Sequence, residues 1–250
     1  MGHVLENTIE SVQKAIELNV DGIEIDVFKS KTGELVVYHD PFLSRLSNSN
    51  AFIEKISLDS IKKIELIGGY FIPALKEIVD IIPEKIFLNI ELKGQDTAFE
   101  TNKIIINYLN TYNFPVSKFI ISSFRWDELK KIRSFNKDIP IAILVDSLYK
   151  IDDAIKLAKQ INAVALNPNK NFITKEIVNN IQSNNIKVYP YTINTPRNIR
   201  RIRSMGVDAI ITDYPERMKI CSSGIILPTG AKYLELRSAN VLFSIKLNPF

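Results

Sequence analysis

The sequence predicts an α/β protein built as a closed (β/α)₈ barrel of the TIM type. Two observations favour this fold. Apolar, β-rich segments alternate with segments of helical period through most of the chain, an order typical of parallel strands joined by crossover helices. Polar residues also recur at the carboxyl ends of several predicted strands, where the active sites of such barrels lie. An open doubly wound sheet is the alternative, but the glycine-rich turn expected after its first strand is missing.

The individual elements are predicted from local pattern. The strands are short runs rich in Ile, Val and Leu, at residues 21–27, 35–39, 85–92, 118–123, 140–144, 162–167, 186–193 and 207–213. The helices show apolar residues at helical spacing, at residues 8–18, 73–82, 96–112, 126–134, 151–160, 174–182 and 196–204. Helix starts are marked by Thr174 and by Thr195, which precedes Pro196 at the first helical position.

Composition narrows the function classes. The 250 residues are 46% hydrophobic, which is enough for one large domain. The net charge of +4 is spread along the chain without a basic run, so we expect no nucleic-acid partner. A single cysteine, Cys221, excludes an intrachain disulfide framework, and we expect a cytoplasmic protein. No apolar run reaches about 18 residues, so no membrane span is expected. The sequence does not determine the oligomeric state.

The stretch GIEIDV, residues 22–27, carries two carboxylates in a segment that is otherwise typical of a buried strand. Side chains alternate along a strand, so Glu24 and Asp26 point to one face and the aliphatic residues to the other. Buried carboxylates without a partner are costly. They therefore require a cation, basic partners or water, and an ion pair with lysines or arginines is the structural alternative.

The stretch IFLNIELKG, residues 86–94, repeats this pattern and places Glu91 and Lys93 on the polar face. If both aliphatic rows pack on the outer helices, then Glu24, Asp26 and Glu91 meet at one mouth of the barrel. Three carboxylates without cysteine form an oxygen site suited to Mg²⁺ or Ca²⁺ rather than to zinc. Lys93 would hold a phosphate oxygen there as a point charge, or would be a solvated strand end.

His39 is one of two histidines in the chain and ends the predicted strand in ELVVYHDP, residues 34–41. A histidine beside a carboxylate-bound cation acts as general acid or base near neutral pH, although a structural role is the alternative.

Residues 40–72, which follow His39, break the alternation of strands and helices. Insertions of this length inside a compact domain are usually functional, so we expect this one to lie over the mouth of the barrel.

The order of these motifs resembles the glycerophosphodiester phosphodiesterase family. The resemblance runs from Leu5 to about Met218 and is carried by LENT, GIEIDVFKSKTGELVVYHDP, LNIELKG, VYPYTIN and GVDAIITDYP. It implies a (β/α)₈ barrel that hydrolyses glycerophosphodiesters to glycerol 3-phosphate and an alcohol. The small-molecule glycerophosphodiester would be the partner of the site.

The resemblance also implies roles for single residues. Glu24, Asp26 and Glu91 match the ligands of a divalent metal, and His39 matches the second catalytic histidine. Lys93 matches a substrate-binding lysine. Tyr191 stands where the family commonly has a tryptophan that lines the glycerol pocket.

Two departures from the family accompany this resemblance. The family begins with a strand ending in His-Arg-Gly, whose histidine is the other acid/base group and whose arginine binds phosphate. LENT begins here at residue 5, and His3 is too close to it to take that role. We therefore expect a barrel domain at 1–218 that lacks the first strand of the family, and an unplaced tail at 219–250. Within that tail, ANVLFSIKL (239–247) is strand-like, and its insertion into the vacant first position is an alternative.

The sequence therefore predicts metal-dependent hydrolysis of glycerophosphodiesters, impaired by the absence of the His-Arg-Gly strand. Two alternatives remain open. The first is a non-catalytic barrel that binds phosphodiesters or a protein partner. The second is a related lipid phosphodiesterase of the phospholipase C or D type. Exposed aromatic side chains on the mouth loops would favour the lipid phosphodiesterase.

Overall fold

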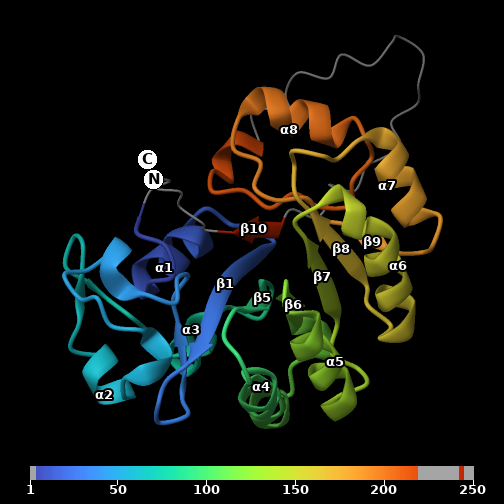
Figure 1. Cartoon of the computed structure of the whole chain (residues 1–250). Helices are drawn as coiled ribbons and strands as arrows, with labels where there is room; N and C mark the ends of the chain where they lie inside the picture. The colour runs from blue at the N-terminus through green and yellow to red at the C-terminus, as the bar shows by residue number, and fades with distance from the viewer. Residues whose placement is uncertain (1–3, 219–241, 245–250) are drawn as a thin grey trace.

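The computed structural model describes residues 4–218 and the short strand Leu242–Ser244. Its centre is a mostly parallel sheet surrounded by helices (Figure 1). The parallel strands follow one another in the order β10 (Leu242–Ser244), β1 (Gly22–Lys29), β5 (Phe87–Leu92), β6 (Phe119–Ser123), β7 (Ile141–Val145), β8 (Ala165–Pro168) and β9 (Lys187–Val188). An α/β fold with a parallel sheet, as predicted, is thus confirmed.

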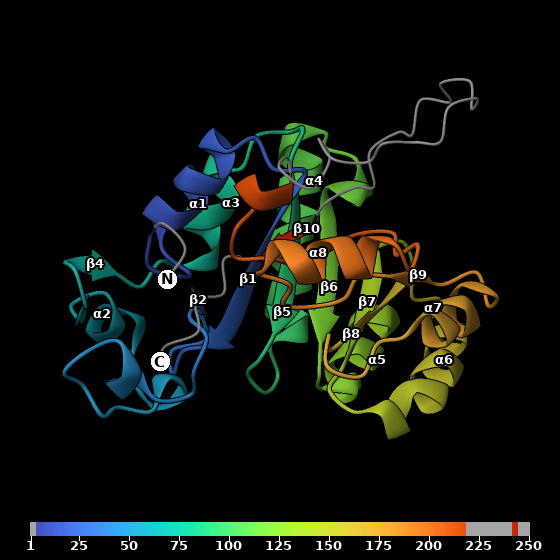
Figure 2. The same ribbon diagram turned by 90° about the horizontal axis from the view of Figure 1, so that it is seen from above.

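All seven predicted helices are present, and their bounds differ by no more than two residues from the predicted ones. They are α1 (Ile9–Glu17), α3 (Leu75–Ile81), α4 (Ala98–Tyr112), α5 (Trp126–Phe135), α6 (Ile151–Gln160), α7 (Lys175–Gln182) and α8 (Pro196–Arg203). Thr174 and Thr195 cap α7 and α8 through their side chains, as their positions in the sequence indicated. Seen from above, α1 and α3 lie on one side of the strands and α6 and α7 on the other, whereas α8 crosses in front of them (Figure 2). None of the helices in residues 4–218 has the length and apolar character needed to cross a bilayer.

The two faces of the sheet differ in composition, and this difference positions the site. The outer face packs on the helices through one large apolar cluster that includes Ile23, Ile25, Leu88, Ile90 and Ile121. The inner face carries a smaller cluster made of Ile120, Ala142, Ala165, Tyr189, Ala209 and Ile211, against which Phe87 packs. Because side chains from β5 to residue 211 share this cluster, the sheet is curled into a barrel-like wall. Polar residues of the inner face lie two residues further toward the carboxyl ends of the strands.

Gly22 shows how closely the inner face is packed below the carboxylates. A Cβ at this position would lie 2.3 Å from the ring of Phe87, so only glycine fits. The ring of Phe87 therefore fills the space under Glu24, which is two residues further along β1 on the same inner face.

The ring of strands is not closed by pairing within the described residues, which corrects the expectation of a closed barrel. The segment 207–213 bonds to the chain after β9, through Ile211 N–H to the carbonyl of Pro190 and Ile193 N–H to the carbonyl of Ile211. Pro190 has no N–H to donate, so a regular ladder does not form there. At the other edge, β10 runs parallel to β1, with Leu242 beside Gly22 and Ser244 beside Glu24.

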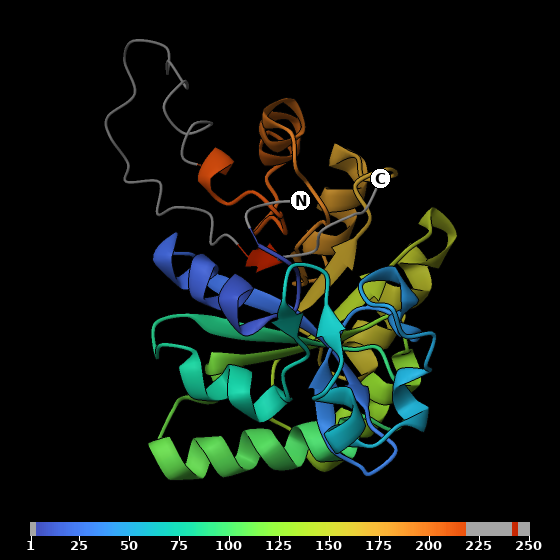
Figure 3. The ribbon, with the colours of Figure 1, turned by 90° about the vertical axis from the view of Figure 1, so that its left-hand side faces the viewer.

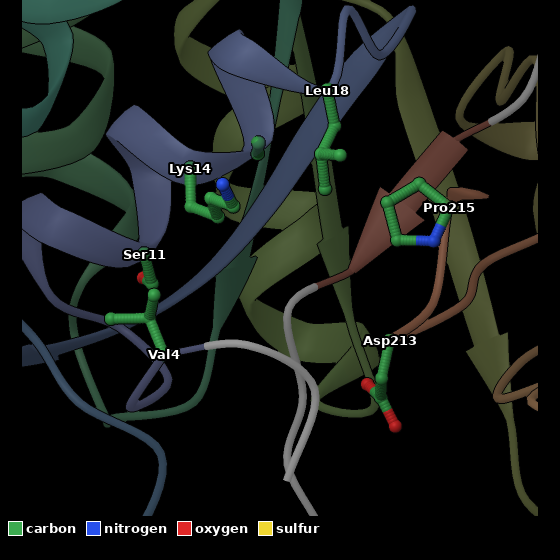
Figure 4. Close-up of a pocket in the computed structure, with 7 residues that line it drawn as sticks. Val4, Ser11, Lys14, Leu18, Asp213 and Pro215 are labelled. Atoms are coloured by element: carbon green, nitrogen blue, oxygen red, sulfur yellow. The ribbon is translucent and has the colours of Figure 1, made fainter.

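A small pocket lies between α1 and residues 213–215, near β10 (Figure 4). Its lining includes Ser11, Lys14, Asp213 and Pro215. Its volume of about 20 Å³ is enough for roughly one water molecule. The pocket is therefore too small to hold an organic substrate.

The second predicted strand does not join the parallel set. It forms β2 (Leu35–Val37), which is antiparallel to β1 and pairs Val37 with Val27. The turn between them contains Gly33 at a φ of 103°, a conformation that glycine adopts without strain. The chain continues back along β1, where Tyr38 N–H bonds to the carbonyl of Asp26. This return brings His39 toward the carboxylates of β1.

The insertion at residues 40–72 has an apolar cluster of its own. It contains the 3₁₀ turns Leu43–Arg45 and Ile53–Lys55, the helix α2 (Leu58–Ile61) and the hairpin of β3 (Glu65–Leu66) and β4 (Tyr70–Phe71). Its buried residues pack with those of the segment before α1 and of the β1–β2 hairpin: Leu5, Phe28, Val36, Tyr38, Leu43, Leu46, Ile53, Ile61, Leu66 and Ile72. The insertion is therefore a packed part of the domain with its own apolar cluster. Figure 3 shows it (cyan) in front of the sheet.

Candidate active site

Three carboxylates meet on the inner face of β1 and β5. Glu24 and Asp26 lie on β1, and Asp26 is the direct register partner of Glu91 on β5. One carboxylate oxygen of each residue lies within 4.8 Å of one oxygen of each of the others. All three side chains are buried, with Asp26 and Glu91 fully inaccessible to solvent. The structure thus brings together the three acidic residues that the sequence placed at one mouth.

This arrangement fits a hard divalent cation. Oxygen ligands bind Ca²⁺ at about 2.3–2.6 Å and Mg²⁺ at about 2.0–2.1 Å, so two ligands of one ion lie up to roughly 4–5 Å apart. The separations among the three carboxylates fall within this span. The cluster contains oxygen donors alone, which is the donor set that Mg²⁺ and Ca²⁺ prefer.

Asn7 orients one of these carboxylates, a role that the sequence pattern did not reveal. Its amide donates to Asp26 Oδ2 at 2.9 Å, and its carbonyl oxygen accepts the backbone N–H of Asp26 at 3.1 Å. Asn7 has a φ of 56°, a left-handed conformation that asparagine tolerates better than most residues. The LENT motif therefore supports the acidic cluster in addition to beginning α1. The only signal in the sequence was an asparagine in a short turn just before a predicted helix.

Lys93 lies at the edge of the acidic cluster. Its Nζ is 3.3 Å from Glu91 Oε1 and 3.8 Å from Asp26 Oδ1. The structural alternative of a basic partner is thus met in part, since the ammonium of Lys93 contacts two of the three carboxylates. Three carboxylates in so small a volume also favour a divalent cation beside Lys93.

His39 contacts Lys93 on one side and Asp40 on the other. Its Nδ1 is 2.6 Å from Asp40 Oδ1, and its Nε2 is 3.3 Å from Lys93 Nζ. A carboxylate accepts and an ammonium donates, so Nδ1 carries the proton and Nε2 presents its lone pair. Burial raises the pKa of Asp40, but hydrogen bonds from His39 and Arg45 outweigh it and hold that pKa below its ordinary value. Asp40 is therefore an ionised acceptor that fixes the tautomer of His39.

Tyr191 lies on the opposite wall of the curled sheet, just after β9. Its ring packs edge-on against Phe124 with centroids 5.7 Å apart, and its hydroxyl donates to the carbonyl of Val145 at 3.2 Å. Phe124 and Val145 are at or just beyond the carboxyl ends of β6 and β7. Tyr191 thus belongs to the inner wall at the same end of the strands as the carboxylates.

Buried polar groups continue around the inner wall between these two regions. Ser122 on β6 and Asn167 on β8 are fully buried, and each lies two residues beyond an apolar inner residue of the same strand. Among the described residues, neither the hydroxyl of Ser122 nor the amide of Asn167 has a hydrogen-bond partner. Buried polar atoms require such partners, which water or the hydroxyls of a bound molecule supply.

Comparison with known proteins gives consistent matches. Residues 1–217 match the Glycerophosphoryl diester phosphodiesterase family. The chain is 33% identical over 225 residues to a glycerophosphodiester phosphodiesterase of Caldanaerobacter subterraneus, with 86% of this chain and 91% of that protein covered.

Solved structures agree with this match. The chain is similar to the glycerophosphodiester phosphodiesterase of Thermotoga maritima, with a TM-score of 0.72 and 27% identity, covering 88% of this chain and 92% of that one. It also shares its fold with a phosphodiesterase of Oleispira antarctica in complex with the product sn-glycerol-3-phosphate. That match has a TM-score of 0.78 and 24% identity and covers 87% and 91% of the two chains.

The acidic cluster predicts measurable cation binding. Replacing Glu91 with glutamine removes one charged ligand, and we expect the affinity for Mg²⁺ and Ca²⁺ to fall by about 100-fold, since loss of even an outer partner of a metal ligand typically costs about 10–100-fold. Isothermal titration calorimetry measures the change. Glu65→Gln, on exposed β3, is the matched control and should bind as the unaltered chain does. Equal affinities for Glu91→Gln and Glu65→Gln would contradict the site.

Proposed function

The chain belongs to the glycerophosphoryl diester phosphodiesterase family, and on this premise we propose that it hydrolyses glycerophosphodiesters to glycerol 3-phosphate and an alcohol. The family assignment confirms the resemblance that the motifs indicated. The observation that carries the proposal is the convergence of Glu24, Asp26 and Glu91 within 4.8 Å beside Lys93. A phosphodiester is an anion, and it needs both a cation and a basic side chain at the reacting phosphorus.

We assign the metal-holding role to Glu24, Asp26 and Glu91, with Mg²⁺ or Ca²⁺ as the ion. When bound, the ion supplies Lewis-acid polarisation of the phosphoryl oxygens. Asn7 keeps Asp26 in the orientation that ligation requires. Lys93 binds a phosphate oxygen as a point charge, because its ammonium already lies at the edge of the acidic cluster.

His39 performs proton transfer in this proposal. Its Nε2 lone pair takes a proton from the attacking water, the water oxygen forms a new P–O bond, and the P–O bond to the alcohol breaks, releasing an alkoxide that takes a proton from solvent. Positioned proton transfer of this kind is typically worth about 10²–10⁴ in rate. Proton delivery to the leaving alkoxide falls to a second histidine in the family. Among residues 4–218 and 242–244, the only histidine is His39.

We therefore propose that the 250-residue polypeptide binds metal and substrate but turns over slowly. The Oleispira antarctica relative binds sn-glycerol-3-phosphate, and we propose that Tyr191 lines the corresponding glycerol pocket here. The contact of Tyr191 with Phe124 supports this role, because it places an aromatic surface at the mouth.

A second candidate, a lipid phosphodiesterase of the phospholipase C or D type, is favoured by exposed apolar side chains after the strands. Phe42 is 53% exposed, Leu148 48% and Tyr149 92%. Phe42 follows the His39–Asp40 pair, and the other two follow β7, so all three belong to loops at the carboxyl ends of the strands. A non-catalytic phosphodiester-binding or partner-binding barrel is the remaining alternative, and turnover distinguishes it from both enzymes.

Assay of the chain with glycerophosphocholine tests this proposal. We expect slow, metal-dependent release of choline, abolished by EDTA and by Asp26→Asn. Loss of the imidazole in His39→Asn should lower the remaining rate by about 10²-fold or more, while metal-dependent binding of glycerol 3-phosphate persists. Glu65→Gln is again the control. Binding without any turnover would favour the non-catalytic barrel, and faster cleavage of lysophosphatidylcholine than of glycerophosphocholine would favour the lipid enzyme. Turnover that His39→Asn leaves unchanged would refute the role of His39.

The domain boundary is also a proposal. We propose that residues 1–218 form the barrel domain without the first strand of the family, and that β10 of the tail takes the position next to β1. The parallel register from Gly22 to Glu24 supports this placement.

Truncation after Met218 tests this boundary. The shortened chain should unfold cooperatively in thermal denaturation, but at a lower Tm, because the edge of β1 loses its partner. An unfolded product would refute the boundary, and an unchanged Tm would refute a structural role for β10.

A further inference from the structure

A buried ion pair connects the segment before α1 to the insertion. The side chain of Glu6 is only 2% exposed, and its Oε1 accepts a hydrogen bond from the guanidinium of Arg45. An ionised carboxylate at this depth requires such a partner. Neither residue is among the metal-holding or proton-transferring groups described above.

Arg45 uses a second nitrogen to reach the partner of the catalytic histidine. Its Nε donates to Asp40 Oδ2, while the other oxygen of Asp40 contacts His39 Nδ1 at 2.6 Å. The four side chains therefore form one continuous chain of contacts in the order Glu6, Arg45, Asp40, His39. With both oxygens engaged, Asp40 is held in one rotamer.

The backbone on both sides of Arg45 is fixed by packing. Leu43 is fully buried and Leu46 is 4% exposed, and both belong to the cluster of the insertion. Leu5, which precedes Glu6, is a member of the same cluster. Glu6 and Arg45 are thus brought together by one apolar core, and their separation would require that core to open.

We propose that Arg45, held by Glu6, is a positioning residue that fixes the orientation and tautomer of His39 through Asp40. The insertion at 40–72 then also serves to support the histidine. The proposal deepens the function proposed above and rests on it for its catalytic consequence. The geometry of the four side chains carries it.

Charged side chains contact both ring nitrogens of His39. Asp40 contacts Nδ1 and Lys93 contacts Nε2. Behind them lie Arg45 on the side of Asp40 and Glu91 on the side of Lys93. Without Arg45, Asp40 keeps its bond to His39 but loses the contact that prevents its rotation into solvent. The Nδ1 side of the imidazole is then held less firmly.

The decisive variant is Arg45→Met, which keeps the length and apolar contacts of the side chain and removes the guanidinium. Because this change leaves Glu6 buried without its cation, the double variant Glu6→Gln/Arg45→Met is made alongside it. Arg45→Lys tests rescue by a charge that lacks the planar, two-nitrogen geometry. Leu66→Ala is the matched control, since it weakens the same apolar cluster without touching the chain of contacts.

The primary readout is independent of turnover. The chain has two histidines, so ¹⁵N correlation spectra resolve the imidazole of His39, with His39→Asn providing the assignment. We expect the neutral Nδ1–H tautomer in the unaltered chain and in Leu66→Ala. We expect a mixture of tautomers in Arg45→Met and in the double variant, and an intermediate state in Arg45→Lys. In the assay, kcat should fall by about 10–100-fold for Arg45→Met, the typical effect of losing a residue that orients a functional side chain, with little change in KM.

The outcomes separate this inference from the proposed function. Unchanged tautomer populations in both Arg45 variants would overturn the inference, as would an equal change in Leu66→Ala. If the tautomers shift as expected but neither the unaltered chain nor any variant hydrolyses glycerophosphocholine, the proposed function fails. The positioning of His39 by Arg45 then still stands.

Discussion

The electrostatic demand of three buried carboxylates determines the arrangement of the rest of this site. Glu24, Asp26 and Glu91 come from two neighbouring parallel strands and share one small volume. Like charges this close repel in a medium of low dielectric constant, so positive charge nearby stabilises their arrangement. Lys93 supplies one positive charge, and in the proposed function a divalent cation adds more.

Several local features are explained by this demand. Asn7 adopts a left-handed conformation that lets both ends of its side-chain amide contact Asp26. The hairpin of β1 and β2 returns the chain along β1 and delivers His39 to the side of Lys93. The insertion adds Arg45, whose contact with Asp40 extends the ordered polar network away from the cluster. Charge and position are thus supplied by segments far apart in the sequence.

Much of this arrangement was predictable from sequence, and the reasons are local. The period-two pattern around Glu24 and Glu91 assigns both to the inner face, and parallel pairing then brings them together without further information. The helices were predicted well because their caps and apolar periods are local signals. The position of His39 beside Lys93 was not predictable from the alternation of strands and helices. Seven residues separate the two predicted strands that lead to it, and that spacing specifies an antiparallel hairpin only once their pairing is known. The open seam of the barrel depends on Pro190 and on the pairing of distant edges. The roles of Asn7 and Arg45 depend on contacts between distant segments and leave no periodic signal.

A crystal structure of the chain grown with Mn²⁺ tests the central claim most directly, since the anomalous signal of manganese locates the ion without assumptions about its ligands. The account predicts one strong peak bonded to carboxylate oxygens of Glu24, Asp26 and Glu91, with the ammonium of Lys93 moved away from Glu91. A structure with no peak among these carboxylates, and with Lys93 still in contact with them, would contradict it.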